Sequence, residues 1–158
     1  MKGDLVVRRL RPLDEADIRE VATCLSREWG LALGYTPDET LDWCQSVAGT
    51  QDQCILIAHR DSAMVGIVMV VDNDLEIETD RTPWLSALYI TPGHRGQGIA
   101  HHLIDAAQDF VRNAGGTELY LYAAKGRLIT FYGELGWQPL ETFVQNATDF
   151  VIMRKPLG

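Results

Sequence analysis

Residues 88–100 read L-Y-I-T-P-G-H-R-G-Q-G-I-A and join an apolar run to a helical pattern. The spacing predicts a strand, a glycine-rich turn and the start of a helix. Gly96 and Gly98 lack a Cβ atom, so the backbone there can direct several N–H groups at one point, beside the unpaired donors and positive end of the next helix. This stretch therefore predicts an anion-binding cradle suited to phosphates.

Two other phosphate-binding loops share a pair of glycines. A Walker loop needs Lys and then Ser or Thr after its glycine, whereas Gly98 is followed by Ile99 and Ala100. A Rossmann loop lies near the first strand and has a third glycine, but His101 occupies that position and the expected preceding strand is the fourth. Both alternatives fit the sequence poorly.

Composition favours one domain spanning residues 1–158, because 158 residues with 46% hydrophobic content can form one sizeable core. A formal charge of −8 disfavours nonspecific contact with nucleic acid or anionic membranes and suits cationic ligands, although ordinary solubility also explains it. No apolar run approaches the roughly 18 residues of a membrane span. Cys24, Cys44 and Cys54 have no metal-like spacing, so we expect reduced core thiols in a cytoplasmic protein.

Hydrophobic periodicity predicts an α/β fold with a mixed, mostly antiparallel sheet of six or seven strands and about four helices. Asp14 is a candidate N-cap for the first helix, Thr36-Pro37-Asp38-Glu39 is a capping box for the second, and Gly66 is a candidate bulge. The acidic stretch 72–81 is expected to be a polar loop or a second ribbon. The expected strands are 5–9, 54–59, 64–71, 85–90, 119–122, 137–144 and 150–154, and the expected helices are 14–30, 36–48, 99–114 and 127–135.

Two blocks make this pattern specific. Arg95-Gly96-Gln97-Gly98-Ile99-Ala100 matches R/Q-x-x-G-x-G/A, and residues 131–137, F-Y-G-E-L-G-W, match F-Y-x-x-L-G-F/W about 30 residues downstream. Together with the order of elements, they resemble the GCN5-related N-acetyltransferase (GNAT) superfamily. The resemblance implies that fold for nearly the whole chain, and it implies acetyl-CoA as co-substrate. No metal is expected from the residues, because the adjacent His101 and His102 point to different faces and no carboxylate or cysteine has ligand spacing to them, to His59 or to His94.

The resemblance also implies a coenzyme site. The backbone N–H groups of residues 97–100 would hold the pyrophosphate of coenzyme A without a metal. The strand before the loop would bond the pantetheine arm through its main chain. A pantetheine-binding asparagine common in the family is missing near residue 125, where Lys125 or Arg127 is a possible phosphate contact. The implied coenzyme-binding residues are Leu88, Tyr89, Ile90, Arg95, Gly96, Gln97, Gly98, Ile99, Ala100 and Lys125.

Tyr132 is the catalytic residue that the resemblance implies, because the matching tyrosine protonates, or hydrogen-bonds, the departing thiolate of coenzyme A. The alternative is an aromatic side chain that simply packs beside Phe131 and Trp137. The implied reaction is direct attack of a primary amine on the thioester in a ternary complex. The competing hypothesis is a non-catalytic acyl-CoA-binding or sensing module.

The acceptor side has no comparable motif. By analogy with relatives, we expect Glu28, Trp29 and Trp84 to border the acceptor, which the acidic charge suggests is a cationic amine: a small amine, a polyamine, an aminoglycoside-like molecule or a peptide N-terminus. Some relatives have a glutamate base on the strand before the loop, but residues 85–87 read L-S-A and offer no carboxylate. Asp72, Asp74 and Glu76 follow the third strand and are candidates to attract an ammonium and route its proton to solvent, although a solvated loop is the simpler reading. The resemblance also makes a homodimer possible.

Overall fold

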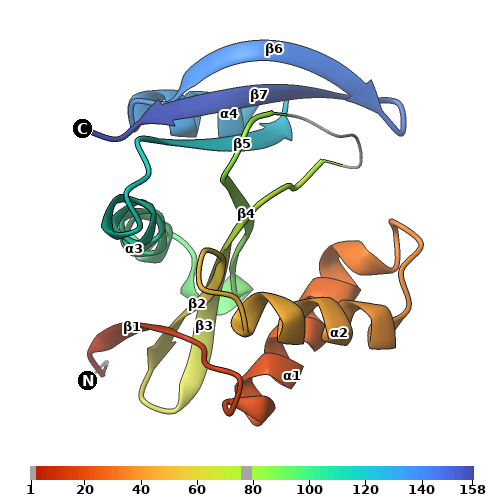
Figure 1. The fold of residues 1–158 in the computed structure, drawn as a ribbon, viewed down its shortest axis with the longest axis vertical. Helices are drawn as coiled ribbons and strands as arrows, with labels where there is room; N and C mark the ends of the chain where they lie inside the picture. The colour runs from red at the N-terminus through yellow and green to blue at the C-terminus, as the bar shows by residue number, and fades with distance from the viewer. Residues whose placement is uncertain (1–2, 76–79) are drawn as a thin grey trace.

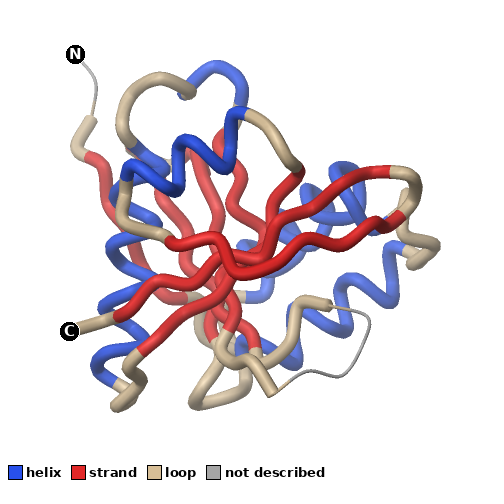
Figure 2. The backbone as a smooth tube through the Cα atoms, turned by 90° about the horizontal axis from the view of Figure 1, so that it is seen from above, coloured by secondary structure: helices blue, strands red, loops and turns tan. Residues whose placement is uncertain are grey.

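The computed structural model describes residues 3–75 and 80–158, and it confirms the predicted α/β fold (Figures 1 and 2). One seven-stranded sheet has the order β1-β2-β3-β4-β5-β7-β6, and its neighbours are antiparallel except for the pair β4–β5. The strands are β1 (Leu5–Arg9), β2 (Cys54–Arg60), β3 (Ala63–Val71), β4 (Trp84–Ile90), β5 (Glu118–Ala124), β6 (Gln138–Gln145) and β7 (Thr148–Pro156). The α-helices are α1 (Glu15–Leu25), α2 (Pro37–Ala48), α3 (Ile99–Asn113) and α4 (Arg127–Glu134), and a π-helical turn, Ser26–Gly30, extends α1.

Helices cover both faces of the sheet, and each face has its own core. Figure 1 shows α3 on one side of β2–β4 and the α1–α2 pair on the other. Because neighbouring strand residues point to opposite faces, Leu85 packs with α3 and Trp84 packs with α1 and α2. We call these two sides the α3 face, which α4 also covers, and the α1–α2 face.

The sheet opens where β4 meets β5. The two parallel strands share a single register pair, Trp84 with Tyr120, and the Tyr120 N–H donates to the carbonyl oxygen of Pro83 at 3.0 Å. Beyond that pair β4 diverges, whereas β5 pairs with β7 along its whole length, from Glu118 to Ala124. The main chain of β4 after Trp84 therefore has no ladder partner on the β5 side, as Figure 1 shows.

A bulge turns β4 at this opening. Tyr89 pairs with Ile67 and Ser86 pairs with Met69, so β4 has one residue more than β3 in this interval. Ala87 takes a positive φ of 56°, which is uncommon for a residue with a side chain. The bulge changes the direction of the strand next to the point where β5 leaves it.

Several local predictions are confirmed. The Thr36–Glu39 capping box is present, since the Thr36 hydroxyl accepts the Glu39 N–H at 3.1 Å and the Glu39 carboxylate accepts the Thr36 N–H at 2.9 Å. A bulge occurs beside Gly66, and a Cβ atom at Gly66 would lie 2.9 Å from Leu103, so the glycine lets α3 approach the strand closely. All three cysteines are free and buried.

Other expectations need correction. Asp14 stands before α1 but makes no capping bond, because its carboxylate accepts the Arg11 N–H at 2.8 Å instead. Ala114 is exposed after the end of α3, and Trp137 precedes β6 rather than belonging to it. Among residues 3–75 and 80–158, no helix has the length and apolar content needed to cross a membrane.

Candidate active site

The loop between β4 and α3 has the backbone shape that its glycines predict. Gly96 and Gly98 have φ values of 74° and 80°, and nothing lies within 4 Å of where a Cβ atom would be. The glycines are therefore required by the left-handed backbone rather than by crowding. No side chain caps the N-terminus of α3, so the first N–H groups of the helix point out of its open end.

Arg95 is a further feature of this loop that fits a phosphate ligand. The side-chain oxygen Oε1 of Gln97 is buried and has no hydrogen-bond partner among the described residues, but as an acceptor it does not bind an anion. Arg95 donates through Nε to the Ile90 carbonyl oxygen at 2.9 Å, and its guanidinium carbon lies 5.5 Å from the centre of the Tyr89 ring. The exposed Arg95 cation thus lies beside the open end of α3, and together they fit the pyrophosphate of coenzyme A.

The fold brings the second sequence block to this loop. His101, in the first turn of α3, packs edge-on against Phe131 of α4, with ring centres 5.5 Å apart. The next residue, Tyr132, is buried on the α3 face and contacts Phe131 at 5.2 Å and Trp137 at 5.8 Å. Burial raises the pKa of Tyr132 to about 12, so its hydroxyl remains protonated and can donate a hydrogen bond at neutral pH.

The other expected coenzyme contacts divide between the two faces. Leu88 and Ile90 pack toward the α3 face, whereas Tyr89 packs toward the α1–α2 face. The Ile90 main chain already pairs with Gly66 and accepts Arg95. Lys125 is exposed at the end of β5, before the first turn of α4, and its own N–H donates to the Asp149 carbonyl oxygen at 2.9 Å.

The expected acceptor residues are only partly brought together. Trp29 is 40% exposed and contacts Tyr89 edge-on, with ring centres 6.2 Å apart, so the end of α1 does border β4. Glu28 is exposed and pairs with Arg27. Trp84 is fully buried, and its indole N–H donates to the Arg81 carbonyl oxygen at 2.7 Å. Trp84 is therefore enclosed in the core of the α1–α2 face, and its burial corrects the expectation that it faces an acceptor.

Asp72 and Asp74, in the acidic segment after β3, have different surroundings. Asp72 is exposed, and its main-chain carbonyl accepts the Thr82 hydroxyl at 2.8 Å. The carboxylate of Asp74 accepts the Ser86 hydroxyl at 2.7 Å, and burial raises its pKa to about 7. Glu76 lies outside the described residues. Ser86 is not a carboxylate and was not among the predicted site residues, although a polar residue inside the apolar strand W-L-S-A-L-Y-I is a usable signal.

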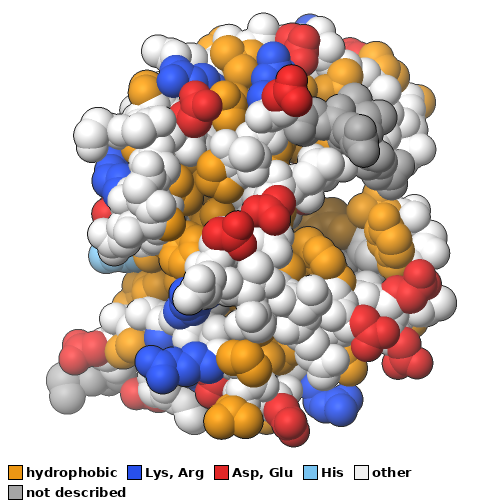
Figure 3. All heavy atoms as spheres, viewed as in Figure 1, with side chains coloured by type: hydrophobic (Ala, Val, Ile, Leu, Met, Phe, Trp, Pro, Cys, Tyr) orange, Lys and Arg blue, Asp and Glu red, His pale blue; other side chains and the backbone are white. Residues whose placement is uncertain are grey.

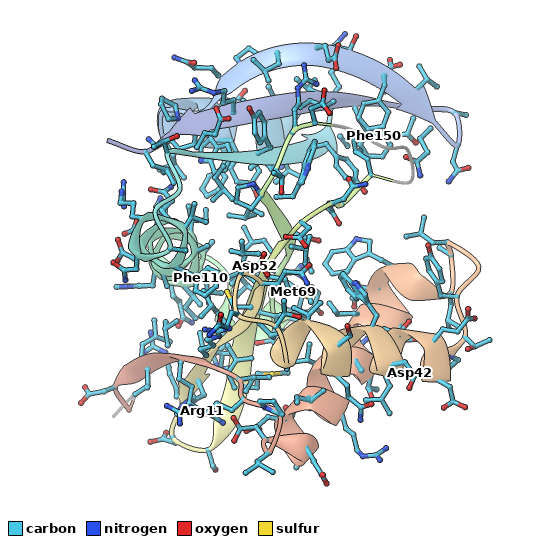
Figure 4. The ribbon with its side chains drawn as sticks, in the orientation of Figure 1. Arg11, Asp42, Asp52, Met69, Phe110 and Phe150 are labelled. Atoms are coloured by element: carbon cyan, nitrogen blue, oxygen red, sulfur yellow. The ribbon has the colours of Figure 1, made fainter. Side chains whose placement is uncertain are left out.

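Space is available on the α1–α2 face. A groove of about 440 Å³ lies between α1 and the ends of β3 and β4, with Cys24, Arg27, Tyr89 and Thr91 among its lining residues. Figure 3 shows a hollow floored by hydrophobic side chains between the α1–α2 layer and the β5–β7 layer. Figure 4 shows Met69 of β3 and Phe150 of β7 on the two halves of the sheet that diverge there. Within the described part of the chain, no group of three or more His, Cys, Asp and Glu is placed to hold a metal ion.

A sheet opened between two parallel strands, with an anion cradle at the end of one of them, defines a site of the coenzyme A-dependent acyltransferase class. The model of the acetyltransferase (GNAT) family matches residues 18–137, and the chain belongs to this family. It is therefore an acetyl-CoA-dependent N-acetyltransferase by family membership. No curated protein matches the sequence.

Solved structures share the fold at low sequence identity. A putative acetyltransferase from Salmonella typhimurium, solved with its cofactor acetyl-CoA, is 17% identical with a TM-score of 0.74, over 99% of this chain and 95% of that one. An aminoglycoside 6'-N-acetyltransferase complexed with coenzyme A is 14% identical with a TM-score of 0.76, over 96% and 97% of the two chains. A GNAT-family acetyltransferase from Streptococcus pneumoniae is 18% identical with a TM-score of 0.73, over 98% and 100%. Two of these three structures contain the coenzyme.

Proposed function

We propose that this enzyme transfers the acetyl group of acetyl-CoA to the primary amine of a cationic acceptor by direct attack in a ternary complex. The acceptor classes that suit it are small amines, polyamines, aminoglycoside-like molecules and peptide N-termini. The observation that carries the proposal is the position of Tyr132, a buried and protonated hydroxyl on α4 whose neighbour Phe131 packs against the first turn of α3.

The chain's own groups would hold the coenzyme as follows. The N–H groups of residues 97–100 bind the pyrophosphate at the positive end of α3, and Arg95 adds a cation beside them. The unpaired edge of β4, at Leu88 to Ile90, bonds the pantetheine arm as an additional strand would. Lys125 is a possible further contact to phosphate. When bound, acetyl-CoA supplies an already activated thioester, so most of the rate comes from positioning the two reactants.

The role of Tyr132 follows from relative acidity. A phenol whose pKa is about 12 is a weaker acid than a thiol, whose ordinary pKa is about 8.5, so complete proton transfer from Tyr132 alone to a thiolate is uphill. The hydroxyl instead donates a hydrogen bond to the sulfur as negative charge develops on it. The proton that finally neutralises the sulfur comes from the attacking nitrogen, relayed by the tyrosine hydroxyl.

Charge supports a cationic acceptor. The chain has 22 acidic and 14 basic residues, and Glu28, which pairs with Arg27, and Trp29 are exposed sequence neighbours in the turn that extends α1. Carboxylates beside indole rings attract ammonium groups through both Coulombic and cation–π interaction. The same charge disfavours nucleic-acid acceptors and anionic membrane surfaces.

The test is thiol release from acetyl-CoA with a panel of acceptors: spermidine, an aminoglycoside, a peptide with a free N-terminus and phenethylamine. We expect turnover with at least one amine, and we expect Tyr132→Phe to lower kcat by about a hundredfold while the Kd for acetyl-CoA stays the same. Tyr120→Phe is the matched control, since it removes a buried tyrosine hydroxyl that bonds Glu118 and Arg154 instead. Coenzyme binding without thiol release for any amine would favour the non-catalytic module. Wild-type turnover in Tyr132→Phe would exclude Tyr132 as the residue that assists the departing thiolate.

A further inference from the structure

Asp74 and Ser86 form a hydrogen-bonded polar pair at the opening of the sheet. The Ser86 hydroxyl donates to the Asp74 carboxylate at 2.7 Å, and Ser86 is 7% exposed. Ser86 lies two residues after Trp84, the last residue of β4 that pairs with β5, and one residue before the bulge at Ala87. The pair therefore stands at the point where β4 separates from β5.

The pair faces the side of the sheet opposite Tyr132. Ser86 pairs across the ladder with Met69 and alternates with Leu85, so its side chain shares the α1–α2 face with Met69 and Trp84. Tyr132 packs in the core of the α3 face. One proton-handling group thus lies on each side of the sheet, with the opening between β4 and β5 separating them.

Hydrogen bonds within the β3–β4 connection and to the start of β4 order the residues around Asp74. The Leu75 N–H donates to the side chain of Asn73 at 3.0 Å, the Thr82 hydroxyl to the Asp72 carbonyl, and the Trp84 indole to the Arg81 carbonyl. Asp74 remains only partly covered, so a ligand can reach it. Fixed position and partial access are what a proton acceptor requires.

We infer that Asp74, held by Ser86, is the catalytic base that takes a proton from the acceptor ammonium. This inference rests on the proposed function of the same site. The acceptor enters as R–NH3+, and the Asp74 carboxylate removes one proton. The neutral nitrogen then uses its lone pair to form the C–N bond to the acetyl carbonyl carbon, while the C–S bond breaks and its electron pair stays on sulfur. The second nitrogen proton reaches the sulfur by way of Tyr132, and Asp74 later releases its proton to water.

The environment of Asp74 agrees with this role. Burial raises the pKa of the carboxyl to about 7, and the Ser86 hydroxyl opposes that rise. Among the described residues, no charged or titratable side chain contributes to this pKa. Asp72 on the same connection is instead influenced by burial and by Asp52 of the α2–β2 turn. A base with a pKa near neutrality is a better match to an ammonium proton than an ordinary carboxylate, yet it is still substantially ionised at neutral pH.

The first test compares kcat/KM from about pH 6 to pH 10 in the wild type, Asp74→Asn and the control Asp80→Asn, with the fastest amine of the four named above. Asp80 is exposed and belongs to the same connection. We expect Asp74→Asn to lower kcat/KM about a hundredfold at pH 7 and to recover toward wild type near pH 10, where solvent supplies neutral amine. Asp80→Asn should follow the wild type throughout.

The second test does not depend on activity. In the enzyme without ligands, a carbon-13 carboxyl resonance that is missing from Asp74→Asn should titrate near pH 7, and Ser86→Ala should move that titration and the acidic limb of kcat/KM to higher pH. If Asp74→Asn does not fold, Ser86→Ala and Asp74→Glu are measured in its place. An acidic limb of kcat/KM that does not shift in Ser86→Ala would overturn the assignment of Asp74 as the base. Wild-type turnover with an unchanged pH profile in Asp74→Asn also overturns it and leaves the proposed function intact. Absence of wild-type turnover overturns both.

Discussion

The two faces of the sheet build their parts of the site in different ways. On the α3 face, the cradle consists of main-chain groups from consecutive residues, 97–100, beside the Arg95 cation, and two glycines with positive φ, Gly96 and Gly98, shape the loop. On the α1–α2 face, the groups come from separate segments: Trp29 follows α1, Tyr89 and Ser86 lie on β4, and Asp74 lies between β3 and β4. The first face suits a ligand that is the same throughout the family, and the second can vary with the acceptor.

The largest expected effect is the loss of coenzyme binding when the loop on the α3 face is changed. Gly98→Asp should raise the Kd for acetyl-CoA at least a hundredfold, because like charges about 4 Å apart near a protein surface repel by a few kcal/mol. Gly98→Asn is the matched control, since Asn tolerates the left-handed backbone equally well and adds no charge. Calorimetric titration checks both variants. Equal affinity in wild type and Gly98→Asp would refute the phosphate assignment.

Asp74 provides a stability comparison on the α1–α2 face. Its pKa of about 7 in the folded state lies above the ordinary value of 3.8, so the folded protein binds this proton more tightly and the contribution of Asp74 to stability falls as pH rises from about 4 to about 7. Each pKa unit is worth about 1.4 kcal/mol, and partial exposure reduces the total. We expect Asp74→Asn to be about 2 kcal/mol more stable than wild type at pH 8.

Urea unfolding measures this difference. The advantage of Asp74→Asn should shrink to less than about 1 kcal/mol by about pH 4 and vanish at lower pH, where the wild-type carboxyl is protonated in both the folded and the unfolded state. A gap that does not change with pH would show that Asp74 titrates normally. Asp80→Asn, which removes an exposed carboxylate from the same connection, is the matched control.

Trp29 tests the acceptor side without touching the cradle. Trp29→Ala should raise the KM for the amine about fivefold, which is the size of a partly exposed cation–π contact, and leave the KM for acetyl-CoA unchanged. Trp43→Ala is the control, because Trp43 on α2 is also 40% exposed. A larger effect on the coenzyme than on the amine would contradict the division between the two faces.

The smallest effect concerns the scaffold of the α1–α2 layer. Thr36→Ala removes the capping box of α2 and should lower the free energy of unfolding by about 1 kcal/mol. Thr23→Ala, on an exposed turn of α1, should change it by less than about 0.5 kcal/mol. The Kd for acetyl-CoA should stay the same in both variants, because the cradle lies on the opposite face.

The contrast also explains what the sequence could predict. Local signals placed the helices and strands well: Thr36 and Glu39 marked α2, Gly98 marked the start of α3, and the L-Y-I run marked β4. The cradle was predictable because its groups are contiguous and need glycine. Asp74 and Ser86 are 12 residues apart and meet only through the β3–β4 ladder and the bulge. Their hydrogen bond could therefore not be predicted from the sequence. Trp84 was misjudged for the same reason, since its burial depends on Tyr120 and Tyr122 of β5.

The central claim is that coenzyme and acceptor enter from opposite faces and meet where β4 leaves β5. A crystal structure with coenzyme A tests it most directly. The claim predicts pyrophosphate oxygens within hydrogen-bond distance of the N–H groups of residues 97–100, the pantetheine arm along Leu88 to Ile90, and the sulfur beside the Tyr132 hydroxyl. Coenzyme A bound instead in the groove lined by Cys24 and Arg27, with the loop empty, would contradict it.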